Sequence, residues 1–203
     1  MNEYKIKFIH KRERKMDKKN ELLAAAREVF AEKGYKAAGI SDIAKRSQMA
    51  VGSFYKYYES KEAIFLEVYI AENSRIREET MRRVDWQGEP EAIVEQLFAV
   101  TFELISPNKI LAEWNKPGIS QILHDYYNQD AGRASNAFHQ FLIQTFSQRL
   151  QEEGFSKEKI AEIMKVYDLI YYIDMHVTEQ EFSGYFDSLE TLVKYFVKGI
   201  FSK

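Results

Sequence analysis

Residues that interrupt helices are scarce in this chain, and this scarcity constrains its fold more than any other feature. The 203 residues include 3 prolines and 9 glycines, and no proline occurs before Pro90. Proline breaks a helix and glycine weakens it, so long stretches of this chain are free to be helical. Apolar residues recur at helical spacing, and no segment alternates as a half-buried strand does. The sequence therefore predicts an all-α fold.

The spacing of apolar residues predicts two domains. Residues 1–16 are basic and read as a flexible arm or as an extension of the first helix. The first domain is predicted over 17–62, with a connecting helix over about 60–83, and the second over 85–203. The boundary is DWQGEP at 85–90, which combines Gly and Pro with a loss of pattern. In the second domain we expect helices at 91–105, about 119–127, 131–153, from 156 onward, and about 185–201.

Charge is distributed unevenly between these parts. Residues 1–61 carry 15 Lys and Arg against 8 Asp and Glu, a net charge of +7, whereas the remaining 142 residues carry 14 against 23, a net of −9. A basic head on an acidic body predicts a polyanion contact that is confined to the head. The alternative is an ordinary solvated surface of mixed charge.

Several function classes lack support in the sequence. The absence of cysteine excludes disulfides, thiol nucleophiles and cysteine metal sites. No HExxH, P-loop or GxSxG motif is present, so we predict no enzyme and no cofactor. His124-Asp125 and Asp174-x-His176 could meet as metal ligands, but scattered structural histidines are the preferred interpretation. No apolar run is long enough to span a bilayer and no secretory signal opens the chain, so we expect a cytoplasmic protein.

Two short predicted helices, one with Ile40, Ile43 and Ala44 facing inward and one over 51–58, are joined by about four residues. This is the geometry of a helix-turn-helix, which places its second helix in the DNA major groove. The segment EVFAEKGYKAAGISDIAKRSQMAVGSFYKYYESKEAIF at 28–65 resembles the DNA-binding domain of the TetR family of bacterial transcriptional regulators. The resemblance implies an N-terminal three-helix DNA-binding domain and a larger helical domain for ligand binding and dimerisation.

The chain departs from the pattern of that family at three positions. Gly39 replaces the usual Thr or Ser cap of the second helix, Gln48 replaces the turn glycine, and Ala50 replaces the Ser that usually caps the recognition helix. Glycine is an acceptable but weaker cap. Gln48 is expected to adopt a left-handed conformation at some cost in strain, or else the turn differs slightly.

The resemblance and the small residues at the start of the recognition helix predict which residues face DNA. Small side chains let the backbone approach base edges, and Tyr hydroxyls and Lys ammonium groups suit phosphates. Phe54 and Tyr58 are expected in the core instead. The predicted DNA-facing residues are Ser41, Ala50, Val51, Gly52, Ser53, Tyr55, Lys56, Tyr57 and Lys61. The basic arm is predicted either to enter a minor groove or to attract DNA without order.

A reader of palindromic DNA needs two copies, so we expect a homodimer. The last two long helices are predicted to form its interface through Ile163, Tyr167, Ile170, Leu189, Leu192, Val193, Phe196, Val197 and Ile200. By resemblance, the middle helices surround a ligand pocket, although aromatic stripes at helical spacing are usually core. The candidate ligand-binding residues are Phe98, Phe102, Trp114, His124, Tyr127, Phe138, Phe141, Tyr167 and Tyr171.

Together these features predict a homodimeric repressor that a small apolar or aromatic ligand releases from its operator. The main alternative is a DNA-binding architectural or interaction protein with no small-molecule effector, which would have a solid second domain without a cavity. A metal-binding enzyme is the remaining alternative.

Overall fold

The computed structural model describes residues 3–116, 118–129, 136–179 and 181–202, and these residues form helices and connecting turns with no strand. The predicted all-α fold is confirmed. The chain divides into two compact units. Unit 1 comprises residues 1–73 and 108–113, and unit 2 comprises 74–107 and 114–203. The division falls inside one long helix, Lys61–Arg83, in the segment that the sequence predicted as a connecting helix over about 60–83.

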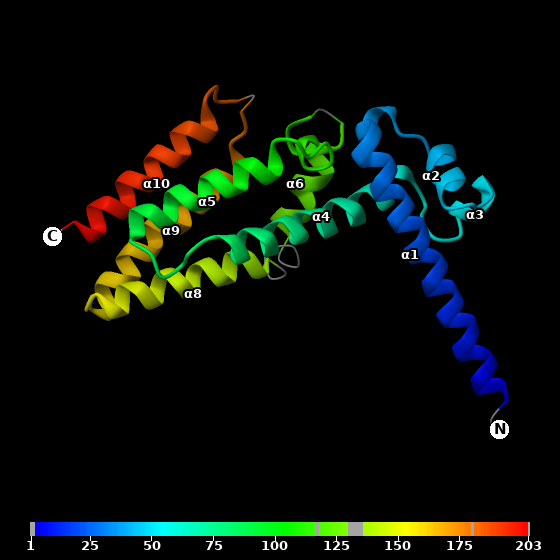
Figure 1. The fold of residues 1–203 in the computed structure, drawn as a ribbon, viewed down its shortest axis with the longest axis horizontal. Helices are drawn as coiled ribbons and strands as arrows, with labels where there is room; N and C mark the ends of the chain where they lie inside the picture. The colour runs from blue at the N-terminus through cyan, green and yellow to red at the C-terminus, as the bar shows by residue number, and fades with distance from the viewer. Residues whose placement is uncertain (1–2, 117, 130–135, 180, 203) are drawn as a thin grey trace. The chain divides into compact units, whose positions relative to one another are not determined.

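Unit 1 is built on α1 (Glu3–Ala37), α2 (Ile40–Arg46), α3 (Val51–Phe54) and the first half of α4 (Lys61–Arg83) (Figure 1). The basic N-terminal segment is the start of α1 rather than a separate element. Gly34 interrupts α1 with a φ of 74°, a conformation that glycine adopts at little cost. The chain can therefore leave the axis of α1 just before α2.

The core of unit 1 is closely packed and aromatic. Phe30 of α1 and Phe65 of α4 are fully buried, with ring centroids 4.9 Å apart in an edge-to-face arrangement. Ile43 from α2 and Phe54 from α3 are also fully buried. The apolar faces that the sequence predicted for these short helices therefore do pack into one core, which fixes α2 and α3 against α1 and α4.

Unit 2 contains the end of α4, α5 (Pro90–Ile105), α6 (Ser120–Asn128), α8 (Ala137–Glu152), α9 (Lys157–His176) and α10 (Tyr185–Phe201). A short 3-10 helix, η1 (Leu111–Asn115), was not expected from the sequence. Within this unit α5 packs along α10, and α8 packs along α9 (Figure 1). Part of the helix predicted over 131–153, its first residues to 135, lies outside the described residues.

The helix starts of unit 2 follow local sequence signals. The Ser156 hydroxyl accepts a hydrogen bond from the Lys159 amide at 3.2 Å, and Asn136 Oδ1 accepts one from the His139 amide at 3.1 Å. Such caps satisfy amides that have no partner within the helix. Across the described residues, no helix has the length and hydropathy needed to cross a membrane.

Candidate functional site

The turn between α2 and α3 is closed by backbone hydrogen bonds around Gln48. The Met49 amide donates to the Ala44 carbonyl at 2.8 Å, and the Gln48 amide donates to the Lys45 carbonyl at 3.2 Å. Gln48 has a φ of 55°, in the left-handed region that L-residues adopt at some cost. The left-handed conformation predicted at this position is confirmed, so the turn keeps its geometry without glycine.

The recognition helix is shorter than the sequence predicted. Its α-helical part ends at Phe54, whereas helical spacing suggested continuation to Tyr58. Beyond Phe54 the backbone tightens, because the Phe54 carbonyl accepts from the amides of both Tyr57 and Tyr58, at 2.9 and 3.1 Å. This tightening buries the Tyr58 ring beside Phe54, with centroids 6.0 Å apart, and leaves Tyr55 57% exposed.

The residues predicted to face DNA share one property: none is buried. Phe54 and Tyr58 are buried behind them, as predicted. The exposed members are Ser41, Ala50, Val51, Gly52, Tyr55 and Lys56, and the half-buried ones are Ser53, Tyr57 and Lys61. A Cβ at Gly52 would meet no atom within 4 Å, so the backbone there is open to close approach. Their contact with DNA stays a prediction.

α2 is held in place by polar contacts that do not involve this exposed surface. Gly39 caps it, and the Asp42 carboxylate accepts from the Gly39 amide at 3.0 Å. A hydrogen bond from Lys33, with the Gly39 amide adding to it, lowers the pKa of Asp42. At the other end of the helix, Arg46 pairs with Glu32 and Glu28 of α1 at 2.7 and 2.8 Å. The first helix therefore fixes the platform that carries α3.

Lys61 has an intramolecular role that the sequence did not reveal. Its ammonium donates to the backbone carbonyls of Tyr35 and Ala38, each at 3.0 Å, and lies 4.2 Å from the centroid of the Tyr35 ring. The Tyr35 hydroxyl in turn donates to Glu62 at 2.6 Å. Lys61 thus ties the start of α4 to the end of α1. The role that the resemblance implies for it, a phosphate contact, remains a prediction beside this structural one.

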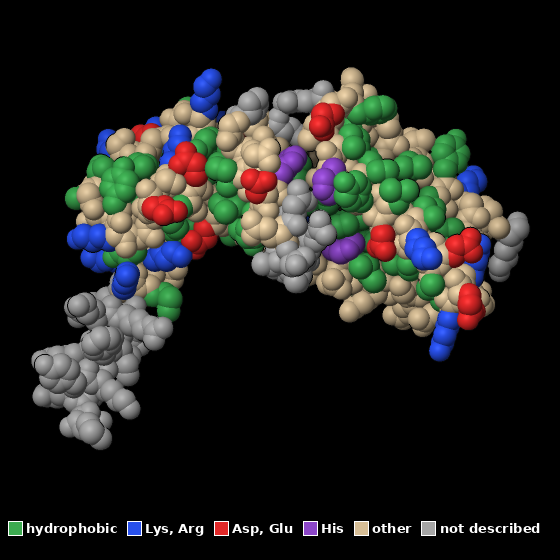
Figure 2. Space-filling view, turned by 180° about the vertical axis from the view of Figure 1, so that it is seen from behind, with side chains coloured by type: hydrophobic (Ala, Val, Ile, Leu, Met, Phe, Trp, Pro, Cys, Tyr) green, Lys and Arg blue, Asp and Glu red, His purple; other side chains and the backbone are tan. Residues whose placement is uncertain are grey.

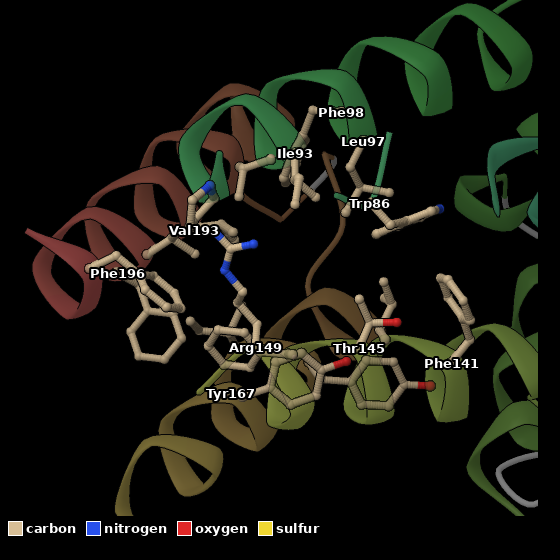
Figure 3. Close-up of a pocket in the computed structure, with 18 of the residues that line it drawn as sticks. Trp86, Ile93, Leu97, Phe98, Phe141, Thr145, Arg149, Tyr167, Val193 and Phe196 are labelled. Atoms are coloured by element: carbon tan, nitrogen blue, oxygen red, sulfur yellow. The ribbon is translucent and has the colours of Figure 1, made fainter. Parts of the chain in front are cut away.

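Unit 2 contains a cavity of about 560 Å³, partly open to the surface, between the α5–α10 pair and the α8–α9 pair (Figure 3). Most of its wall is aromatic and aliphatic. Trp86 and Phe141 pack edge to face near one end, with centroids 4.9 Å apart. Polar side chains interrupt this surface at a few points, among them Thr145, Arg149 and Asp174. A largely apolar cavity with a few polar groups is typical of a small-molecule site.

Known proteins resemble both the sequence and the fold. Residues 22–68 match the family described as "Bacterial regulatory proteins, tetR family". The N-terminal helix-turn-helix domain of this chain therefore belongs to the TetR family. The HTH-type transcriptional regulator YdgC of Bacillus subtilis is 38% identical over 65 residues, and QacR of Staphylococcus aureus is 34% identical over 64. Each match covers 32% of this chain, and 33% and 34% of YdgC and QacR respectively.

The fold likeness extends over nearly the whole chain. A TetR-like transcriptional regulator from Rhodococcus sp. RHA1 superposes with a TM-score of 0.51, covering 92% of this chain and 97% of the other at 18% identity. At this identity the likeness concerns the fold alone. The named relatives are transcriptional regulators rather than enzymes, in agreement with the prediction from the sequence.

The cavity in unit 2 takes in some of the predicted ligand-binding residues. Phe98, Phe141, Tyr167 and Tyr171 line it. Phe138 is buried under the Arg77 guanidinium, which lies 4.8 Å from the centroid of its ring. The Trp114 ring packs in a tilted arrangement against His124, with centroids 4.2 Å apart, and edge to face against Tyr127, with centroids 5.6 Å apart, in a separate cluster. Phe102 is 57% exposed. Of the predicted ligand-binding residues, therefore, only Phe98, Phe141, Tyr167 and Tyr171 line the cavity. The others lie on a different helix face or in a different part of the chain.

The structure also places residues of the predicted dimer interface on the cavity wall. They are Tyr167, Ile170, Leu189, Val193, Phe196 and Val197. Of the other three, Ile163 is buried, Ile200 is half-buried and Leu192 is 44% exposed. Helical spacing identified apolar stripes correctly but could not tell a wall that faces a cavity from one that faces a second copy. Their role in a dimer interface stays a prediction.

The sequence reasoning missed Trp86 and Arg149 as cavity residues. Trp86 lies in the segment between α4 and α5, which the sequence marked as a boundary. Arg149 is a charged residue in the last turn of α8, next to the apolar residues of that helix. An arginine within an aromatic stripe is the signal that could have identified the second. No group of three or more potential metal ligands comes together among the described side chains, and the pairing suggested for His124-Asp125 and Asp174-x-His176 forms no such group.

Proposed function

We propose that this chain is a transcriptional regulator that binds a palindromic operator as a homodimer and is released by a small apolar or aromatic ligand. The observation that carries the proposal is the exposed surface from Ala50 to Lys56, presented over a buried anchor of Phe54 and Tyr58. A rigid base under exposed side chains is what base recognition requires, because the contacts must be held in register.

The DNA contacts divide by chemistry. Ala50, Val51 and Gly52 leave the backbone open to base edges, and Val51 offers its methyl groups to a thymine. Tyr55 and Lys56 present a hydroxyl and an ammonium for phosphates or for a guanine edge. Figure 2 shows Lys and Arg side chains on the face of unit 1 that is in view, in keeping with an electrostatic attraction to DNA.

The operator is identified first, by selecting the fragments of random DNA that the full chain binds and reading their half-site spacing. Lys56→Ala is then expected to weaken operator binding and to flatten the slope of log affinity against log salt by about 1. Tyr55→Ala should weaken binding with little change in that slope. Lys165→Ala removes an equally exposed lysine from α9 and serves as the control. Unchanged titrations for both Tyr55→Ala and Lys56→Ala would remove the proposed contacts.

A second copy would find an unusual apolar surface on the last two helices. α9 exposes Val166, Leu169 and Tyr172, by 43%, 58% and 57%, and α10 exposes Leu192 and Tyr195, by 44% and 71%. The face of unit 2 drawn in Figure 2 carries broad hydrophobic areas. Large exposed apolar side chains at helical spacing favour a protein partner, and the proposed partner is a second copy of this chain.

Light scattering after size-exclusion chromatography tests this surface. Wild-type protein at micromolar concentration is expected at twice the chain mass, and Leu192→Asp is expected to shift it toward the monomer. Met16→Asp places the same charge at an exposed apolar residue of α1 and should leave the mass unchanged. A monomeric wild type would contradict the dimer proposal.

The cavity favours a regulator that a ligand releases from its operator over an architectural protein without an effector, because the second domain of the latter would have no cavity. α4 contributes residues to both units, so a ligand that favours one shape of unit 2 would act on unit 1 through that helix. Coupling of about 1–3 kcal/mol would change operator affinity roughly 5- to 150-fold. Equal operator affinity with and without a ligand that binds the cavity would refute this part of the proposal.

A further inference from the structure

The charged groups on the cavity wall differ in whether they have hydrogen-bond partners. Arg149, near the end of α8, directs its guanidinium into the cavity between Thr145 and Val193 (Figure 3). Its Nε is buried and has no hydrogen-bond acceptor among the described residues. The Glu153 carboxylate lies 3.6 Å from it, close enough for an ion pair but too far for a hydrogen bond. The structure therefore has an arginine with unused donor capacity facing an apolar space.

The acids that line the same cavity already have partners. Glu152 accepts from the Gln148 side-chain amide at 2.8 Å on the exposed side of α8. Asp174 accepts from the Tyr185 hydroxyl at 3.4 Å and lies in the field of Arg77. A buried donor without an acceptor costs free energy, so the wall favours an incoming anion over an incoming cation.

The apolar wall sets the size and shape of the rest of the occupant. Arg149 and Phe141 lie eight residues apart on α8, which corresponds to about 12 Å along the helix axis at about 1.5 Å per residue. Trp86 covers the wall beside Phe141, and its indole N–H is already bonded to the Met81 carbonyl at 2.7 Å. That end of the cavity therefore presents ring faces and edges but leaves no indole donor for a ligand.

We propose that the cavity binds an apolar monocarboxylate, with the carboxylate on the Arg149 guanidinium and a body of about 12 Å extending toward Trp86 and Phe141. This inference rests on the proposed function, because it names the chemical class of the effector. An arginine fork can hold both oxygens of one carboxylate, and the surrounding apolar wall strengthens that contact.

Isothermal titration of the full chain with octanoate, octanol and octylammonium separates the head group from the shared tail. Wild-type protein is expected to bind octanoate roughly tenfold or more tightly than octanol, and octylammonium most weakly. Equal affinity for octanoate and octanol, or a preference for octylammonium, would overturn the proposal without the use of any variant.

Variants then locate the contact. Arg149→Gln should abolish the preference for octanoate over octanol, and Arg149→Lys should retain part of it. Arg82→Gln removes an exposed arginine that pairs with Glu79 outside the cavity and is the matched control. Val193→Phe adds bulk to the cavity wall and should weaken octanoate and octanol alike. If Arg149→Gln, with an unchanged circular dichroism spectrum, keeps the full preference, the assignment to Arg149 is wrong.

Operator binding is measured separately in the same samples. Octanoate binding that depends on Arg149 without any effect on DNA would uphold this inference and contradict ligand release. Operator binding together with no preference for octanoate would uphold the DNA proposal and overturn this inference.

Discussion

The two units of this chain use aromatic side chains in opposite ways. In unit 1 the rings of Phe30, Phe65 and Tyr35 fill the interior, with centroids 4.8 and 4.9 Å from Phe65 to its neighbours. In unit 2 the rings of Phe98, Phe141 and Phe196 stand around a space of about 560 Å³. A filled core can carry function only on its outer surface, whereas an unfilled one can carry it inside.

The comparison explains why the two candidate sites differ in kind. The surface of α3 has to meet DNA in a fixed register, so a dense core beneath it is an advantage. A cavity has to admit a molecule and respond to it, and incomplete packing gives that freedom.

The largest effect should come from removing a ring in the filled core. Phe65→Ala is expected to lower the free energy of unfolding by about 3–5 kcal/mol, because Phe65 is fully buried against Phe30, Tyr35 and Tyr69. Phe141→Ala, at the cavity wall, should cost only about 1 kcal/mol, because less packing is lost there. Urea denaturation of both variants measures this difference. Equal losses would show that the cavity wall is as tightly packed as the core.

Lys61 and Lys56 should separate structural from DNA-facing lysines. Lys61→Met is expected to lower the free energy of unfolding by about 1–3 kcal/mol, because the Tyr35 and Ala38 carbonyls lose a charged donor. Lys56→Met, at an exposed position, should stay within about 0.5 kcal/mol of wild type. Thermal and urea unfolding measure both. If Lys61→Met weakens DNA binding at full stability, Lys61 acts mainly on phosphate.

The turn residue Gln48 should yield a smaller gain. Gln48→Gly is expected to raise the free energy of unfolding by up to about 1 kcal/mol, because glycine adopts a φ of 55° without steric strain. Gln48→Ala keeps that strain and is the matched control, with a change near zero. A loss of stability in Gln48→Gly would mean that the Gln48 side chain stabilises the turn in a way its backbone conformation does not explain.

Acid should affect unit 2 before unit 1. Burial lowers the pKa of His139 below 6.5, with Asp168 opposing the shift. The stability that the neutral His139 ring contributes is therefore complete above pH 6.5 and is lost as the pH falls below that value. In unit 1 the hydrogen bond from the Tyr35 hydroxyl lowers the pKa of Glu62 below 4.5. The stability that the Glu62 carboxylate contributes is therefore complete above pH 4.5 and is lost as the pH falls below that value.

Melting temperature as a function of pH tests this order. His139→Phe keeps a ring against Tyr171, which stacks on His139 at 3.7 Å, and removes the proton site. The variant should flatten the decline of melting temperature just below pH 6.5 and leave the decline below 4.5 unchanged. An unchanged profile would assign the first decline to other groups.

Local patterns were enough to predict most helices. The cap at Ser156 and the left-handed conformation of Gln48 depend on residues within a few positions of each other. The family motif indicated which residues of α3 and of the turn after it face outward, and the exposure of Tyr55 agrees with it. The burial of Tyr58 agrees with the prediction from helical spacing. These features are readable from sequence because each depends on one helix or one turn.

The sequence by itself determined the helical fold and the basic head, because these follow from spacing, local capping and charge along one segment, and its family motif indicated the outward-facing residues near α3. Only the tertiary structure decided that Val193 and Phe196 face a cavity, that Lys61 holds two carbonyls of α1, and that Arg149 turns inward. An apolar stripe has the same period whether it meets another helix, a second copy or an empty space. What lies opposite it depends on how distant helices pair, and no local pattern contains that information.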